Sequence, residues 1–358
     1  MRYAVIGLLV GMLAGCGDSS ATTSKKPQAS PDDTAAVESL AAVAELKKNK
    51  AGNVTEVNLR GKSVSDDLLQ SLTGLKQLRS VLLNETEITD DSLKILGQLT
   101  TVTNLDLRGC SVSNDGLKHL ANMTQLRALR LNGESGSTTV DDAGLEHIAG
   151  LTNLKALALD HLWVSGDGLA YLSKLENLEE LYLAKTLFGD ESIAALKSLP
   201  KLKKIRISQT QVSDAGLQEL ASIKTLEDLD LSENSLLTDS GMTHVGGLTE
   251  LRKLNLWRVA VTDDGIGHLS DLRKLKSLNL DNTQLGNDGL VHLKKMTDLE
   301  FLHLGSTQIT DDGLPELEVL KSLKDLKITR TGVTESGAAS LAEALPNTEI
   351  QLKYIESE

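Results

Sequence analysis

Pairs of neighbouring aspartates recur along this chain, and they are the first residues whose type and spacing could do chemistry. The pairs are Asp66-Asp67, Asp90-Asp91, Asp141-Asp142, Asp263-Asp264 and Asp311-Asp312. A ladder of carboxylates could bind Ca²⁺, which takes about six to eight oxygen ligands from a closed loop. Acids at the start of a helix also favour the positive end of its dipole, and this explanation accounts for the spacing without an ion. We therefore predict no metal site at these pairs.

Histidines also recur at one position of a repeating pattern, where a row of imidazoles could bind zinc. Five of the seven histidines share that position: His119, His147, His244, His268 and His292. Zinc needs ring nitrogens about 2.1 Å away, whereas neighbouring helices pack roughly 8–10 Å apart. Inheritance from a duplicated unit explains the recurrence more simply. No metal and no cofactor is predicted here either.

The sequence carries no signature of an enzyme. It has no glycine-rich nucleotide loop, no HExxH motif and no CxxC motif. The segment Gly133-Glu134-Ser135-Gly136-Ser137 resembles a nucleophile elbow, but its fifth residue is serine where that motif has glycine. We interpret the segment as a turn and predict a protein without catalytic activity.

A repeat of 24 residues organises most of the chain. An apolar-x-apolar pair occurs thirteen times, and ten of the twelve intervals between pairs are 24 residues long. One interval is 28, through an insertion in 133–139, and one is 25. The pair has the period of a strand, and the apolar residues after it have the spacing of a helix. Threonines before the acidic pairs are expected to cap these helices: Thr89, Thr262 and Thr310.

Composition supports a repetitive core. The 358 residues include sixty-nine leucines and only eight aromatic residues, so one side-chain shape is used repeatedly. A single 24-residue unit cannot bury its leucines, and neighbouring units must stack to do so. Two cysteines are too few for a disulfide scaffold.

The repeat grammar LxxLxLxxTxVTDDGLxxLxxL resembles the bacterial 24-residue variant of the leucine-rich repeat family. The copy LKSLNLDNTQLGNDGLVHLKKMTD, from Leu275 to Asp298, shows it most clearly. This variant is similar to the ribonuclease-inhibitor-like and cysteine-containing subfamilies, and Asn234 occupies the cysteine position in its own copy. The resemblance covers residues 52–355. It implies an α/β fold: a right-handed solenoid, or horseshoe, with a parallel concave sheet of about thirteen strands and convex helices.

The N-terminus has the pattern of an exported protein. In residues 1–15, Arg2 precedes an apolar run from Ala4 to Ala14, as in a secretory signal peptide. The run ends in Leu13-Ala14-Gly15-Cys16, which resembles the bacterial lipobox. That resemblance implies cleavage before Cys16, lipidation of its thiol and a bacterial leucine-rich repeat lipoprotein. The alternative is a plain signal peptide with an incidental cysteine.

The segments that follow are expected to connect this anchor to the repeats. Residues 16–34 are rich in Ser, Thr, Pro and charge, so we predict a flexible lipidated stalk. Residues 35–51 are predicted to form an N-terminal capping helix, and 52–358 the leucine-rich-repeat domain. Gly17 is not the aspartate that favours inner-membrane retention, so we expect the outer membrane or the cell surface. The net charge of −13 argues against nucleic acid and against binding anionic head groups, which leaves the lipid as the membrane contact.

The concave face is the surface on which the copies differ, so we expect binding there. The candidate binding residues are Arg130, Tyr182, Arg206, Trp257 and His303. Trp, Tyr and Arg dominate binding hot spots. Trp257 points away from core Leu256 and is expected to be exposed. Trp163 is predicted to lie on the same rim as the insertion at 133–139.

These residues predict a non-covalent protein partner, whose identity the sequence does not give. Tyr182 and Trp257 would instead suit a glycan or peptidoglycan if their rings served as stacking platforms. A ubiquitin-ligase adaptor, as in some similar repeat proteins, is a less favoured alternative, and an enzyme is the least favoured. An adaptor would need an F-box helix, and residues 17–50 offer only a stalk and a cap.

Overall fold

Residues 31–353 are described by a computed structural model, and across them fourteen strands form one sheet in chain order. The strands from β2 to β14 pair in parallel with one another, which confirms the thirteen strands predicted from the repeat. β1 pairs antiparallel with β2. The strands are β1 Glu45–Lys48, β2 Val54–Asn58, β3 Ser80–Leu82, β4 Asn104–Asp106, β5 Ala128–Asn132, β6 Ala156–Asp160, β7 Glu180–Tyr182, β8 Lys204–Arg206, β9 Asp228–Asp230, β10 Lys253–Asn255, β11 Ser277–Asn279, β12 Phe301–His303, β13 Asp325–Lys327 and β14 Glu349–Gln351.

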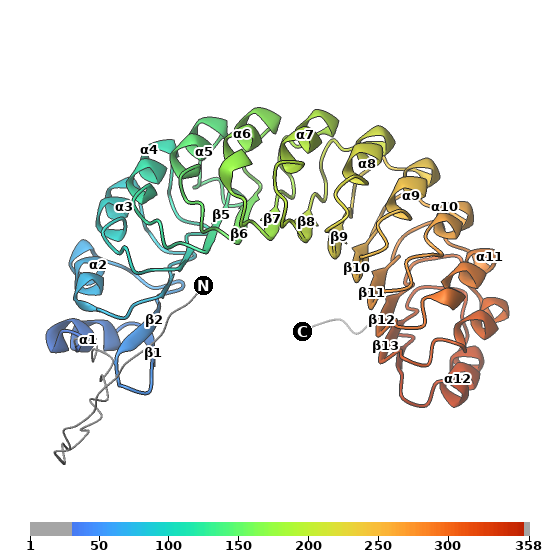
Figure 1. Cartoon of the computed structure of the whole chain (residues 1–358). Helices are drawn as coiled ribbons and strands as arrows, with labels where there is room; N and C mark the ends of the chain where they lie inside the picture. The colour runs from blue at the N-terminus through green and yellow to red at the C-terminus, as the bar shows by residue number, and fades with distance from the viewer. Residues whose placement is uncertain (1–30, 354–358) are drawn as a thin grey trace, which may run out of the picture. The chain divides into compact units, whose positions relative to one another are not determined.

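Short helices alternate with the strands. The α-helices are α1 Thr34–Ala41, α2 Asp66–Ser71, α3 Asp90–Leu96, α4 Asn114–Leu117, α5 Asp142–Ile148, α6 Gly166–Ala170, α7 Ile193–Leu196, α8 Asp214–Leu220, α9 Asp239–Val245, α10 Asp263–His268, α11 Asn287–Leu290 and α12 Glu335–Ala344. The 3₁₀ helices are η1 Leu72–Gly74, η2 Lys118–Leu120, η3 Tyr171–Lys174, η4 Asp190–Ser192, η5 Val291–Lys295 and η6 Asp311–Leu317. In the repeat body the strands line the inner side of the arc and the helices the outer side (Figure 1). This arrangement confirms the predicted α/β solenoid.

These helices form because the repeat supplies a cap and a packed apolar face. α8 begins after Ser213, whose hydroxyl accepts a hydrogen bond from the Ala215 N–H (3.2 Å), and it buries Leu217 and Leu220. Helices of about two turns are unstable in water by themselves, so packing on the next repeat holds them.

Two of the predicted threonine caps differ in outcome. Thr262 caps α10 by accepting from the Asp264 N–H (3.3 Å), as expected. Thr310 makes no cap to η6; its hydroxyl accepts instead from Asn287 Nδ2 (2.8 Å). The prediction for Thr310 was wrong because the Asn287 side-chain amide of the preceding repeat, and not a backbone N–H of η6, donates to the Thr310 hydroxyl.

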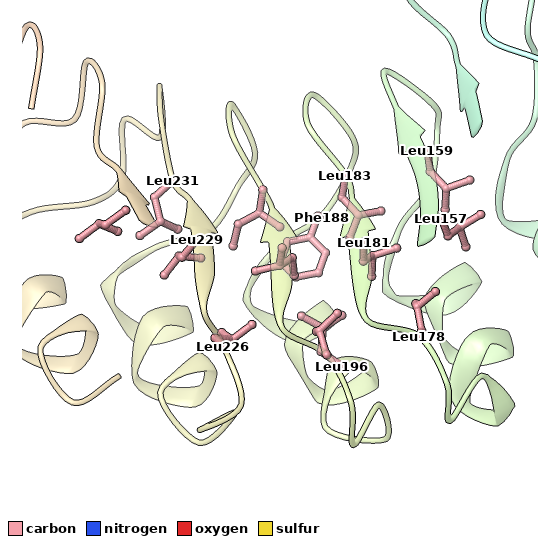
Figure 2. Packing of buried hydrophobic residues seen from close by; sticks show 14 of the residues in the cluster. Leu157, Leu159, Leu178, Leu181, Leu183, Phe188, Leu196, Leu226, Leu229 and Leu231 are labelled. Atoms are coloured by element: carbon pink, nitrogen blue, oxygen red, sulfur yellow. The ribbon is translucent and has the colours of Figure 1, made fainter. Parts of the chain in front are cut away.

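The core is a set of leucine columns that run across the repeats. Leu157, Leu181 and Ile205 are paired in register, and all three are fully buried. Phe188 occupies the position that valine holds in neighbouring copies, and it is also fully buried. Figure 2 shows its ring among the leucines of adjoining repeats. The single large ring therefore fills space that leucine and valine share elsewhere.

One buried polar position joins successive turns. The Asn234 amide accepts from the Thr210 N–H (2.7 Å) and donates to the carbonyls of Ile207 (2.8 Å) and Leu231 (2.9 Å). Cys110 occupies the same position in its copy, is buried, and its thiol donates to the Leu83 carbonyl (3.2 Å). The side chain at the cysteine position of the repeat thus donates hydrogen bonds to buried backbone carbonyls, which would otherwise have no partner.

The N-terminal cap differs from the helix predicted over 35–51. The helix α1 ends at Ala41, and residues 45–48 form β1, which pairs with β2. A turn makes this possible: the Asn49 side chain accepts from the N–H of Ala51 (2.9 Å) and of Asn53 (3.1 Å), and Gly52 has a φ of 85°. The charged strand β1 protects the edge of the sheet, where an apolar strand would invite aggregation.

The stalk predicted over 16–34 also ends earlier than expected. The Asp32 carboxylate accepts from the backbone N–H of Val54 (2.6 Å) and of Lys76 (2.8 Å). Asp33 caps α1 through the N–H of Ala35 (2.9 Å). These acids therefore belong to the folded body, where they satisfy backbone donors at its start.

The predicted signal peptide and Cys16 lie outside the described residues. Among residues 31–353 no helix combines the length and the hydrophobicity needed to cross a membrane.

Candidate functional site

The sheet brings the predicted central column into register along its inner face. Arg130 is paired with Ala158, Tyr182 with Arg206, and His303 with Lys327. These residues lie on β5 to β13, so the candidates are spread along the sheet. Only Tyr182 and Arg206 are direct neighbours among the five.

Arg206 lies between two carboxylates on this face. Its guanidinium is 3.5 Å from Asp160 Oδ2 and 3.8 Å from Asp230 Oδ2, and its Nε donates to Ser208 Oγ (3.3 Å). Asp160 is buried and also accepts from the Ala184 N–H (2.7 Å). Burial raises the pKa of Asp160, and the charge of Arg206 partly opposes that rise. The arginine is thus held in place before any partner arrives.

Tyr182 is held in a similar way. Its hydroxyl donates to Glu180 Oε2 (2.6 Å), and Lys204 Nζ lies 5.4 Å from the ring centre. Burial and the bond to Glu180 raise the pKa of Tyr182 to about 12. The phenol therefore stays protonated at neutral pH, and one face of its ring is covered by a cation.

Trp257 is half-buried, which differs from the expected exposure. The guanidinium of Arg258, the next residue, lies 5.5 Å from the indole ring and covers part of it. The strand alternation correctly turned Trp257 away from the core, but it could not reveal the neighbouring cation. A stacking platform for a sugar ring is therefore less available at Tyr182 and Trp257 than the sequence suggested.

Arg130 belongs to an arginine cluster that the sequence did not single out. The buried Asp106 carboxylate accepts from Arg108 Nε (2.9 Å) and Nη2 (2.7 Å), and Arg60 lies 3.8 Å from it. Arg130 donates to Asn104 Oδ1 and lines the same hollow of about 520 Å³. Asp106 and Arg108 lie two residues apart and so point to the same, inner face of the sheet. This spacing could have predicted their ion pair from the sequence.

His303 lies near the other end of the sheet. It lines a hollow of about 220 Å³ with Asp281, Lys327 and Thr329. Burial lowers the pKa of His303, although Asp281 opposes that effect. The imidazole is therefore neutral at pH 7 and can either donate or accept a hydrogen bond.

Comparison with known families agrees with this architecture. A family described as "Leucine-rich repeat region" matches residues 54–263, and one described as "Leucine Rich repeat" matches 271–293 and 295–317. The chain belongs to the leucine-rich repeat family. No curated protein matches it.

Solved structures of other proteins superpose on the leucine-rich-repeat body of this chain. An internalin (inlF) from Listeria monocytogenes superposes with a TM-score of 0.60 at 22% identity, covering 91% of this chain and 96% of that one. A TLR13–ssRNA13 complex gives 0.59 at 20% identity, covering 84% of this chain and 43% of that one. A leucine-rich-repeat protein of Leptospira interrogans gives 0.48 at 18%, covering 83% and 90%. At these identities the likeness to the first two structures concerns the fold alone.

The rim of the leucine-rich-repeat body carries two neighbouring apolar side chains. Trp163 is 71% exposed, as its position outside the leucine pattern indicated, and Leu187 is 48% exposed. They occupy the same position of successive repeats, and the Leu187 N–H donates to the Val164 carbonyl beside Trp163 (3.0 Å). The insertion at 133–139 closes with a turn, in which the Gly136 N–H donates to the Gly133 carbonyl (2.9 Å). Leu187 could have been found from its 24-residue spacing.

Aspartates at the starts of the helices, some of them from the acidic pairs, join successive leucine-rich repeats. Asp239 accepts from both the N–H (2.8 Å) and the hydroxyl (2.6 Å) of Thr262 in the next repeat. The same two hydrogen bonds, from the N–H and the hydroxyl of a Ser or Thr to an aspartate of the preceding repeat, recur five times. They are donated by Ser113 to Asp90, Ser165 to Asp142, Ser213 to Asp190, Thr238 to Asp214 and Thr334 to Asp311. Both oxygens of these carboxylates are thus used by the protein. One acid in three of the five pairs, namely Asp90, Asp142 or Asp311, thus joins two repeats, a role that helix-dipole reasoning did not reveal.

The recurrent histidines lie on the helical side of successive repeats. Four of them are partly buried and His268 is exposed. Within residues 31–353, no group of three or more His, Cys, Asp or Glu side chains is arranged to hold a metal ion.

Proposed function

We propose that this leucine-rich-repeat protein is an extracytoplasmic scaffold, tethered to the bacterial envelope through Cys16, that binds a protein on its concave face without catalysing a reaction. The observation that carries the proposal is the pre-arranged polar network on that face. Arg206 is fixed between Asp160 and Asp230, and Tyr182 is fixed by Glu180. Side chains ordered in advance lose less entropy on binding, which favours affinity.

The binding surface can be tested with the full chain and a partner recovered from native membranes. We expect Arg206→Ala to weaken the partner's affinity roughly 30-fold, as hot-spot arginines do, with a smaller loss for Trp257→Ala because Arg258 already covers part of its ring. Dissociation constants from calorimetry give the comparison, and a circular dichroism melt checks that each variant is folded.

Lys118→Ala is the matched control, because Lys118 lies in η2 on the helical side of the body. The Lys118→Ala variant should bind the partner with the same affinity as the unaltered chain. Unchanged affinity for both Arg206→Ala and Trp257→Ala would remove the concave face from the proposal.

The anchor has its own test. Cells that express the chain are grown with a clickable palmitate analogue, and the purified protein is examined for the label. We expect labelling of the unaltered chain and complete loss in Cys16→Ser, because the thiol is the predicted acceptor. Cys110→Ser is the control and should keep the label, since the Cys110 thiol is buried. A labelled Cys16→Ser variant would contradict the lipid anchor.

A further inference from the structure

The hollow of about 520 Å³ near the start of the sheet contains three arginines, Arg60, Arg108 and Arg130, and we call it the arginine hollow. The other charged side chains that line it are Glu45, Lys47, Glu56 and Asp106. Its four cations thus exceed its three carboxylates by one positive charge, whereas the whole chain has a net charge of −13. A local positive surface on an acidic protein attracts an anionic ligand to that place.

Two of the three carboxylates are already used by neighbouring cations. Asp106 is only 1% exposed and accepts from Arg108 Nε (2.9 Å) and Nη2 (2.7 Å). Glu56 pairs with Lys47 (2.6 Å). The bidentate contact between Asp106 and Arg108 also restrains both planar groups. The arginine hollow therefore has an ordered wall before a ligand arrives.

Arg130 is the cation of the hollow that has no carboxylate partner among the described residues. It lies directly opposite Asp106 in the pairing of β4 with β5, but both Asp106 oxygens accept from Arg108. Arg130 donates instead to Oδ1 of the neutral Asn104. A guanidinium carries five N–H groups, so four of them remain available to a ligand. The side chain is only partly buried, so these donors are open to solvent.

The neighbouring strand leaves room beside Arg130. Arg130 is paired with Ala158 on β6, and Ala128 is paired with Ala156 two residues earlier in the same ladder. A single methyl group can neither pair with a guanidinium nor cover it, so the surface of the sheet is low at this point. An extended peptide can therefore lie over the alanines and direct a side chain to Arg130.

The shape and the charge of the hollow favour a carboxylate over a phosphate. The flat fork of a guanidinium matches the two oxygens of a carboxylate in one plane. One excess positive charge balances the single negative charge of a carboxylate, whereas a phosphate monoester carries about −1.5 to −2 at pH 7. A nucleic acid strand would also bring further phosphates toward Glu45 and Glu56 and toward a chain of net charge −13.

We propose that the arginine hollow binds an acidic side chain of the protein partner, an aspartate or a glutamate, with Arg130 as its principal contact. Arg60 and Arg108 add positive charge beside it. This inference rests on the proposed protein-binding function and deepens it, because it names the chemistry that the partner presents. Arg206 is a different kind of contact, since two carboxylates of the protein already offset its charge.

The test uses the full chain labelled with ¹⁵N-arginine, in which the Nε–H signal of Arg130 is assigned through Arg130→Gln and that of Arg108 through Arg108→Lys. A capped peptide with two glutamates between alanines is titrated in, and the same peptide with two glutamines is the matched probe. We expect the glutamate peptide to shift both signals saturably and the glutamine peptide to leave them unchanged. Added NaCl should weaken binding of the glutamate peptide, because salt screens the attraction between exposed charges.

Arg130→Gln removes the charge and most of the donors, so it should weaken binding of the glutamate peptide about tenfold or more, as followed at the Arg108 signal. Arg273→Gln is the matched control, because it makes the same change of charge at an exposed residue that pairs with Asp271 in the turn before β11. This variant should bind the peptide as the unaltered chain does. Circular dichroism checks that each variant is folded.

Any of three results would contradict the proposal. The first is that the two peptides shift the Arg130 signal equally or that neither shifts it. The second is that Arg130→Gln binds the glutamate peptide as tightly as Arg273→Gln does. The third is a saturable shift with inorganic phosphate or a short oligothymidylate, titrated as separate arms, and none with the glutamate peptide, which would make the hollow a phosphate site.

These peptides require no partner recovered from membranes. Failure of the peptide test therefore leaves the comparison of Arg206→Ala with Trp257→Ala unaffected. Unchanged partner affinity in that comparison would likewise leave the peptide result as it stands, so the two failures are distinguishable.

Discussion

Replacing Phe188 with alanine is expected to lower the free energy of unfolding by about 3–5 kcal/mol, the usual cost of deleting a buried phenylalanine ring. Phe188 is fully buried and lies among leucines from adjoining repeats, as Figure 2 shows. Neighbours that are already close-packed can collapse into the space only in part, so a cavity remains. Urea unfolding followed by circular dichroism measures the loss.

Phe301→Ala is the matched control for this substitution. Phe301 is only partly buried, on the inner face of β12, with Lys327 5.6 Å from its ring. We expect a loss of about 1 kcal/mol or less there, since less apolar area leaves water on folding. Equal losses for the two variants would contradict the central position of Phe188. In a repeat array each unit contacts only its neighbours, so the slope of the transition must be compared as well.

Replacing Gly265 with alanine is expected to destabilise the protein by about 2–4 kcal/mol, although the same change stabilises most helices. A Cβ at residue 265 would lie 2.2 Å from Asp239 Oδ1 and 2.6 Å from Val261 Cγ1. The carboxylate would have to move, and its two hydrogen bonds to Thr262 would be lost. Hydrogen bonds to charged groups contribute about 1.5–3 kcal/mol each.

Gly150→Ala supplies the opposite expectation from the same chemistry. Its Cβ would meet nothing within 4 Å, so the change should be neutral or slightly stabilising, because alanine restricts the unfolded chain. The midpoint of urea unfolding distinguishes the two. A Gly265→Ala variant as stable as Gly150→Ala would show that the Asp239 bridge does not depend on close approach.

The bridge also explains why glycine recurs at the third position of these helices. At Gly116, Gly216 and Gly313, a Cβ would lie within 2.5 Å of the bridging Asp or Asn oxygen of the preceding repeat. In the segment Thr262–Gly265 the motif TDDG thus combines a cap, a carboxylate that reaches the next repeat and a glycine that makes room for the carboxylate before it. Sequence reasoning recognised the first of these and assigned the acids to the helix dipole.

The functional side chains were predictable only in their direction. Strand alternation placed Arg206, Tyr182 and Trp257 on the inner face, because successive residues of a strand point to opposite sides. Glu180 shares the inner face of β7 with Tyr182, so alternation makes the two neighbours. Alternation could not give Asp160 as a partner of Arg206, since these residues lie two strands apart and meet only when the repeats stack. Asp106 and Arg108 could have been paired by the same alternation, whereas the approach of Arg60 to Asp106 follows only from the stacked repeats.

The N-terminal cap shows where local pattern failed. An amphipathic run predicted one helix over 35–51, but Gly52 and the Asn49 side chain turn the chain back, so that Glu45–Lys48 pairs with β2. Pairing satisfies the backbone groups of an otherwise open sheet edge, and a local helix would leave them exposed. That gain exists only when the first repeat is already folded.

The repeat length, the strand count of the parallel sheet, the leucine core and the direction of the strand side chains could all be predicted without a structure, because each follows from periodicity. Only the stacking of the repeats shows which carboxylates join successive copies and that Lys204 lies over the Tyr182 ring. The physical reason is distance: periodicity is a property of neighbours along the chain, whereas these contacts join side chains about 24 residues apart that meet only when the repeats stack.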